Sequence, residues 1–106
     1  MTTDRELIEL AAKAAGIEVE FAVFSDDSFI CFEKGGDCFR DEWNPLTDDG
    51  DALRLAVTLK ITPHIDGNLT DAESIVGFAT KAHFNDPYAA TRRAIVKAAA
   101  EIGRTL

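Results

Sequence analysis

The sequence predicts an α+β domain in which a mainly antiparallel sheet of about five strands packs with three helices, in the order αβββαββα. Segments with apolar residues at helical spacing begin at capping residues, and they alternate with short segments rich in β-branched and aromatic residues. Turn residues separate these segments. The chain has 106 residues, 46% hydrophobic and 28% charged, which is typical of one globular domain spanning residues 1–106.

A first helix is expected over about residues 3–15. Thr3 and Glu6 have the spacing of a capping box, in which each side chain satisfies a backbone amide of the first turn. Leucines and alanines then recur at helical intervals and form one apolar stripe. Gly16 ends the helix, because glycine adopts the left-handed conformation at little cost.

Three strands are expected to follow, at about 17–24, 29–32 and 38–43. The first alternates apolar and polar residues at its start, as a half-buried strand does. The glycine pair at 35–36 favours a two-residue hairpin turn, and that register places Phe32 opposite Phe39.

A second helix is expected from Thr47 or Asp48 to about Lys60. Acidic residues gather at its start, where the helix dipole stabilises negative charge. Because most of its surface is apolar, we expect it to be the most buried helix. Its polar stripe consists of Asp51, Arg54 and Thr58.

The C-terminal half predicts two strands, 61–65 and 74–79, and a third helix. The proline within 61–65 predicts an edge strand, since proline offers no amide to a sheet. Asp86 before Pro87 is a favoured helix start, and Gly103 is expected to end the helix.

The formal net charge of −8 argues against nonspecific binding to nucleic acids or anionic membranes. The charge is uneven along the chain. Residues 26–51 hold nine acidic and two basic residues, whereas residues 81–106 hold five basic and two acidic residues. The acidic region is either a solvated loop region or a face that meets a basic partner, which could be a neighbouring copy's C-terminal helix.

No catalytic, cofactor-binding or metal-binding residues are predicted. His64 and His83 have no serine or cysteine partner in a nucleophile motif, and glycine-rich nucleotide-binding patterns are missing from the sequence. Cys31 and Cys38 lack the spacing of a zinc site. The acids around Gly50 lack the spaced oxygen ligands of a calcium loop.

The segment that begins at Trp43 is the candidate interaction site. A tryptophan beside a proline turn either pins a loop onto the core or anchors a protein partner, since tryptophan is enriched in interface anchors. The candidate interaction residues are Trp43, Pro45, Leu46, Asp48, Asp49 and Asp51.

The same segment, over residues 43–56, resembles the phage ABA sandwich family of small proteins from phage and prophage regions of proteobacteria. Residues 5–17 and 86–103 resemble that family's opening and closing helices, so the resemblance spans nearly the whole chain. It implies a sheet packed with helices and a phage or prophage origin, and it carries over no functional residues.

Three functions follow as hypotheses. The first is a phage or prophage accessory protein that binds another protein, of phage or host, without catalysis; a homodimer stays open. The second is an acidic nucleic-acid mimic that inhibits a host defence or DNA-processing protein. The third is a small enzyme or metal protein built on His64, His83 and the acidic helix start. With no signal-peptide pattern and no apolar run of about 20 residues, we expect no membrane contact and a location in the bacterial host cytoplasm.

Overall fold

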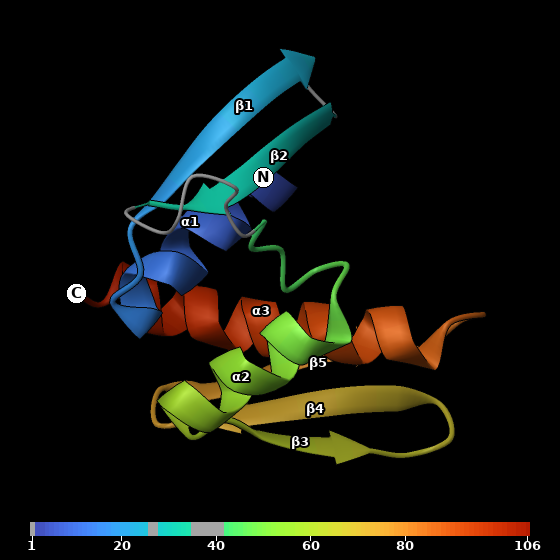
Figure 1. Ribbon diagram of the computed structural model, residues 1–106. Helices are drawn as coiled ribbons and strands as arrows, with labels where there is room; N and C mark the ends of the chain where they lie inside the picture. The colour runs from blue at the N-terminus through green and yellow to red at the C-terminus, as the bar shows by residue number, and fades with distance from the viewer. Residues whose placement is uncertain (1, 26–27, 35–41) are drawn as a thin grey trace.

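The computed structural model describes residues 2–25, 28–34 and 42–106 (Figure 1). It confirms the α+β class, with three helices and five antiparallel strands. No helix within these residues is long and apolar enough to span a bilayer. In chain order the elements are α1 (Asp4–Ala15), β1 (Val19–Ser25), β2 (Ser28–Glu33), α2 (Asp49–Leu59), β3 (Thr62–Ile65), β4 (Leu69–Ser74), β5 (Gly77–Ala82) and α3 (Pro87–Arg104).

The strands form two sheets where one was expected. The β1–β2 hairpin lies on one side of the helices, and the sheet of order β3–β4–β5 lies on the other (Figure 1). The helical layer between them has apolar side chains on more than one side, so each sheet covers a different face of it.

The most buried helix is α3, and the expectation that α2 would be is wrong. Nine of the 18 residues of α3 are buried, five of them alanines, and α3 packs against α1, α2 and all three strands of the larger sheet. By contrast, Leu53 and Val57 on α2 are 63% and 70% exposed. Small side chains allow close approach on several sides, which a count of large apolar residues does not reveal.

The predicted helix starts are confirmed by capping contacts. The Thr3 hydroxyl accepts a hydrogen bond from the Glu6 amide at 3.2 Å, and Gly16 ends α1 in the left-handed conformation. Asp48 caps α2 by accepting from the Asp51 amide, and Asp86 caps α3 by accepting from the Ala89 amide. Local sequence chemistry therefore determines where the helices begin.

The strand expected at 74–79 is found in part: residues 77–79 begin β5, but residues 75–76 are the turn between β4 and β5. β4 ends at Ser74, which pairs with Gly77 at the start of β5. Gly77 has φ 131°, a conformation that side-chain-bearing residues rarely adopt. β4 escaped prediction because the residues on its buried face, Thr70 and Ala72, are small. β3 lies at the sheet edge, as its proline predicted.

The strand expected at 38–43 falls mostly on residues 38–41, outside the described residues, as does the glycine pair at 35–36. The predicted pairing of Phe32 with Phe39 also involves a residue outside the described ones, whereas Phe32 forms an isolated antiparallel bridge with Glu42. The Trp43 amide donates to the Cys31 carbonyl at 2.8 Å, so residues 42–43 pair with β2.

Gly103 lies inside the last turn of α3, not beyond its end, and the backbone of α1 passes close to it. An added Cβ would stand 2.1 Å from the Leu10 carbonyl oxygen, so Gly103→Ala must push the two helices apart. A glycine-to-alanine change within a helix is normally favourable by up to about 1 kcal/mol. Here we expect the free energy of unfolding to fall by roughly 2 kcal/mol or more, measured by urea denaturation.

Gly67→Ala is the matched control, since no heavy atom lies within 4 Å of its added Cβ. If both variants unfolded at the same urea concentration, the close approach of α1 and α3 would be contradicted.

Candidate functional site

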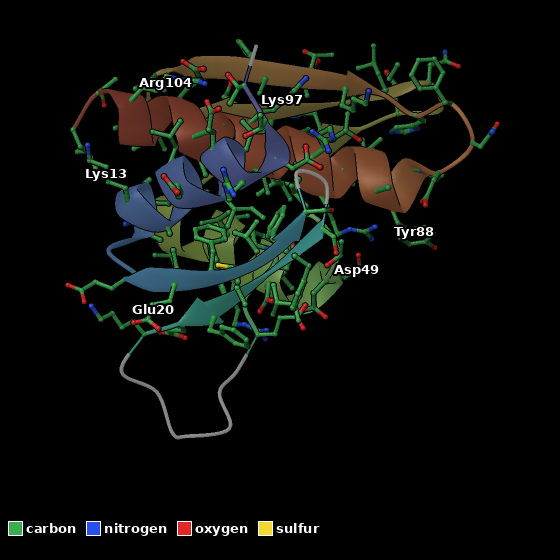
Figure 2. The ribbon with its side chains drawn as sticks, turned by 90° about the horizontal axis from the view of Figure 1, so that it is seen from above. Lys13, Glu20, Asp49, Tyr88, Lys97 and Arg104 are labelled. Atoms are coloured by element: carbon green, nitrogen blue, oxygen red, sulfur yellow. The ribbon has the colours of Figure 1, made fainter. Side chains whose placement is uncertain are left out.

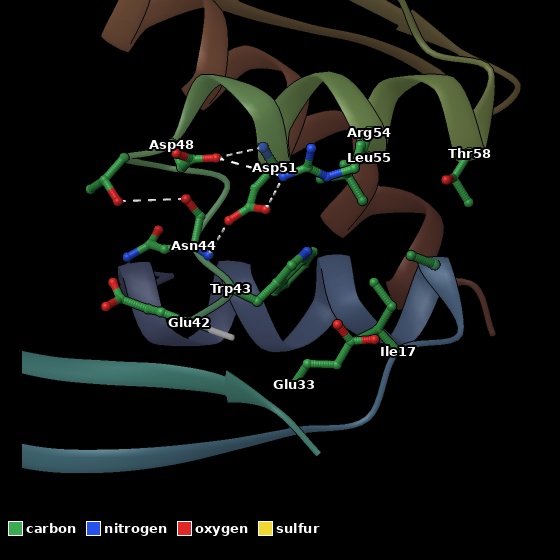
Figure 3. Close-up of a pocket in the computed structure, with 12 residues that line it drawn as sticks. Ile17, Glu33, Glu42, Trp43, Asn44, Asp48, Asp51, Arg54, Leu55 and Thr58 are labelled. Carbon is green, nitrogen blue, oxygen red and sulfur yellow. Dashed lines mark hydrogen bonds and ion pairs between the residues drawn. The ribbon is translucent and has the colours of Figure 1, made fainter. Parts of the chain in front are cut away.

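An open pocket of about 870 Å³ lies where β2, the 42–48 segment, α2 and the end of α1 meet (Figure 3). Among the described residues that line it, four are carboxylates and one is a guanidinium, that of Arg54. Trp43, Ile17 and Leu55 supply apolar wall. The carboxylates are those of Glu33, Glu42, Asp48 and Asp51.

Asp51 is the structural centre of this pocket. Its side chain is only 11% exposed and accepts two hydrogen bonds, from the Asn44 amide at 2.9 Å and from Arg54 at 2.8 Å (Figure 3). The hydrogen bond to Asp51 raises the pKa of Arg54 above its ordinary value. Arg54 also lies 3.8 Å from Asp48, so the two aspartates are compensated by one cation.

The 42–48 segment is also tied to α3. Arg92 donates from Nε to the Leu46 carbonyl at 2.8 Å and forms an ion pair with Asp49 at 2.6 Å. Within the turn, the Asn44 side chain accepts from the Leu46 amide at 3.0 Å. Because β2, α2 and α3 each hold it, the segment presents a fixed surface to the pocket.

Trp43 belongs to the hydrophobic core and lines the pocket as well. It is 7% exposed, so it pins the segment onto the core. This is the first of the two roles that the sequence suggested for it. Across the described part of the chain, nothing accepts a hydrogen bond from its indole N–H. Figure 3 shows the ring nitrogen at the end of the indole that faces the space between α2 and Ile17.

The predicted interaction residues separate into two groups. Trp43, Asp48 and Asp51 line the pocket. Pro45 is fully buried, Leu46 is partly buried, and Asp49 is engaged by Arg92, so these three support the segment.

Sequence reasoning missed Glu33, Glu42 and Ile17, which reach the pocket from outside the 43–51 segment. The polar stripe of α2 did carry a signal, because all its members line the pocket: Asp51, Arg54 and Thr58.

The electrostatic environment beside the pocket is negative. Burial raises the pKa of the Cys31 thiol to about 12, and the negative charges of Glu42, Glu9 and Asp51 act in the same direction. The negative charge of these acids therefore disfavours a nearby thiolate, and the same charge attracts a cation.

The histidines lie away from this pocket. His83 is buried, and its Nε2 lies 2.8 Å from the Thr70 hydroxyl, which lies 2.9 Å from the Thr91 hydroxyl. This chain of contacts joins β4 to α3. His64 is exposed on β3, opposite Asp71. In the described ranges, no group of three or more histidines, cysteines or carboxylates could hold a metal ion.

A second hollow, of about 550 Å³, lies between β5 and α3 and is lined partly by cations. Arg93 pairs with Asp4 at 2.9 Å, and Arg104 pairs with Glu101. Lys97 forms no ion pair with a residue that the structure describes. Figure 2 shows Lys97 and Arg104 on the opposite side of the molecule from Glu20 on β1. The charged regions also meet, because Arg92 of the basic region forms an ion pair with Asp49 of the acidic region.

Comparison with known proteins gives no relative: no family model, curated protein or solved structure matches the chain. The resemblance to the phage ABA sandwich family therefore stays a prediction.

Asp51→Asn should destabilise the protein by about 1–3 kcal/mol, because it weakens a buried acceptor of two hydrogen bonds. Asp49→Asn is the matched control: its side chain is 69% exposed, and such ion pairs contribute below about 1 kcal/mol. Urea unfolding followed by the fluorescence of the single tryptophan measures both. Equal losses in the two variants would contradict the central place of Asp51.

Cys31 should resist alkylation in the folded protein, because it is fully buried and its pKa is raised from an ordinary 9.0 to about 12. In a Cys38→Ser background, iodoacetamide at pH 9 should label the chain in urea but not the native protein. The same shift lowers stability as pH rises from 9 towards 12, since only the unfolded thiol loses its proton there. Equal labelling rates would contradict the burial of this thiol.

Proposed function

We propose that this protein is a phage- or prophage-encoded accessory protein that acts by binding another protein, without catalysing a reaction. The phage setting rests on the sequence resemblance alone. The binding site in this proposal is the pocket at Trp43, and the partner presents a basic surface to it.

The observation that carries the proposal is the negative charge of the pocket, which exceeds the positive charge among its described lining residues. Arg54 serves Asp48 and Asp51, whereas Glu33 and Glu42 form no ion pair with any residue in the described ranges. Both glutamates are exposed at an open hollow with apolar wall, so a basic partner would gain charge pairs and apolar contact there.

The alternative function is that of a nucleic-acid mimic, and the described acidic residues support it less than they support binding of a basic protein partner. A mimic needs carboxylates free to stand in for phosphates along one face. Asp49 and Asp51 are instead engaged by the chain's own arginines. Four acids of this region, at positions 26, 27, 37 and 41, lie outside the described residues. The third hypothesis gains no support, since neither histidine lies at the acidic pocket.

Affinity capture from lysates of the bacterial host and of phage-infected cells tests the proposal. The wild-type chain should retain a protein reproducibly at low salt and release it as salt rises, because surface charge pairs are screened. The double variant Glu33→Gln/Glu42→Gln should lose that protein.

The matched control is Glu20→Gln/Glu73→Gln, which makes the same change in net charge at exposed glutamates outside both hollows. It should retain the protein. Capture that is lost equally in both double variants, or no reproducible capture at all, would overturn the proposal.

A further inference from the structure

We infer that the Trp43 pocket takes a cationic side chain of a peptide segment, paired with Glu33, while a carbonyl of the same segment accepts a hydrogen bond from the Trp43 indole. This inference rests on the proposed function and names the chemistry of the partner at that site.

The Trp43 indole N–H has no hydrogen-bond acceptor among the described residues. The indole N–H can only donate, and a buried donor without an acceptor is costly. Trp43 is more than nine-tenths buried, and no described residue accepts from it. Its nitrogen faces the space bounded by Leu55 and Ile17 (Figure 3). A complementary ligand therefore carries an acceptor, and peptides carry one at every residue.

The carboxylate of Glu33 lies near that donor. Glu33 extends from the end of β2 and lies beside Ile17 in Figure 3, below the free end of the indole. Asp51 and Asp48 already share Arg54, whereas Glu33 forms no ion pair with any described residue at this end of the pocket. A ligand that fits here carries positive charge.

An apolar wall lies between these two polar groups. Ile17, Leu55 and the indole ring line the pocket together. The methylene stem of arginine or lysine packs against such a wall while its charged end reaches a carboxylate. A free inorganic cation would leave both the wall and the indole donor unused.

The sole tryptophan makes the test direct, because the ¹H–¹⁵N spectrum holds a single indole resonance. The probe is acetyl-Ala-Arg-Ala-amide, titrated into the full chain. We expect a saturable downfield shift of the indole proton as its hydrogen bond forms. The citrulline analogue, which has the same shape without the charge, should bind at least about tenfold more weakly, the factor that 1.4 kcal/mol of lost charge pairing gives.

Two variants locate the charge. Glu33→Gln should weaken the arginine peptide by about tenfold, whereas Glu73→Gln on β4 should leave its affinity unchanged. Ethylguanidinium, which has the cation but no carbonyl, should leave the indole proton unshifted. Both glutamates are exposed, and the dispersion of the same spectrum reports whether each variant is folded.

An unshifted indole proton at saturating arginine peptide would overturn the inference, as would equal binding of the citrulline analogue or an unchanged affinity in Glu33→Gln. These results are distinct from a failure of the proposed function. If capture depends on Glu33 and Glu42 but the indole never responds, the protein-binding role stands and this ligand is wrong. If the indole responds but lysates yield no partner, the ligand stands and the role is wrong.

Discussion

The structure depends on the close packing of α3, whose buried side chains are mostly small. Five of its buried residues are alanines, and Gly103 lets the backbone of α1 approach. Close packing of this kind brings α1, α2 and the larger sheet against one helix, where larger side chains would hold them apart. The candidate site inherits this constraint, because Arg92 of α3 holds both Leu46 and Asp49 in place.

Within that frame, Asp51 joins structure to function. It accepts hydrogen bonds from the Asn44 amide and from Arg54, and these contacts shape the pocket. Arg54, the one cation among the pocket's described lining residues, is therefore already paired. Among the residues that the structure describes, Glu33 has no cationic partner and the Trp43 indole N–H has no acceptor. Groups that the fold leaves unsatisfied at an open pocket are those that a partner can satisfy, and the proposed ligand follows from them.

The helices could be predicted because their signals are local: Thr3, Asp48 and Asp86 each cap the turn that follows them. The division into two sheets and the central place of α3 could not be predicted from local signals, since both depend on which faces of the helices and strands pack together. The site was predicted in part. Trp43 and the polar stripe of α2 were visible in the sequence. Glu33 reaches the pocket through the pairing of β2 with residues 42–43, and Ile17 reaches it from the end of α1, and neither contact is local in the sequence.

An experimental structure of the protein with its captured partner tests the central claim most directly. We expect the Trp43 pocket to be occupied by an arginine or lysine of the partner, with its charged end on Glu33 and a carbonyl that accepts from the indole nitrogen. A partner bound on another face, with the pocket filled only by water, would contradict it.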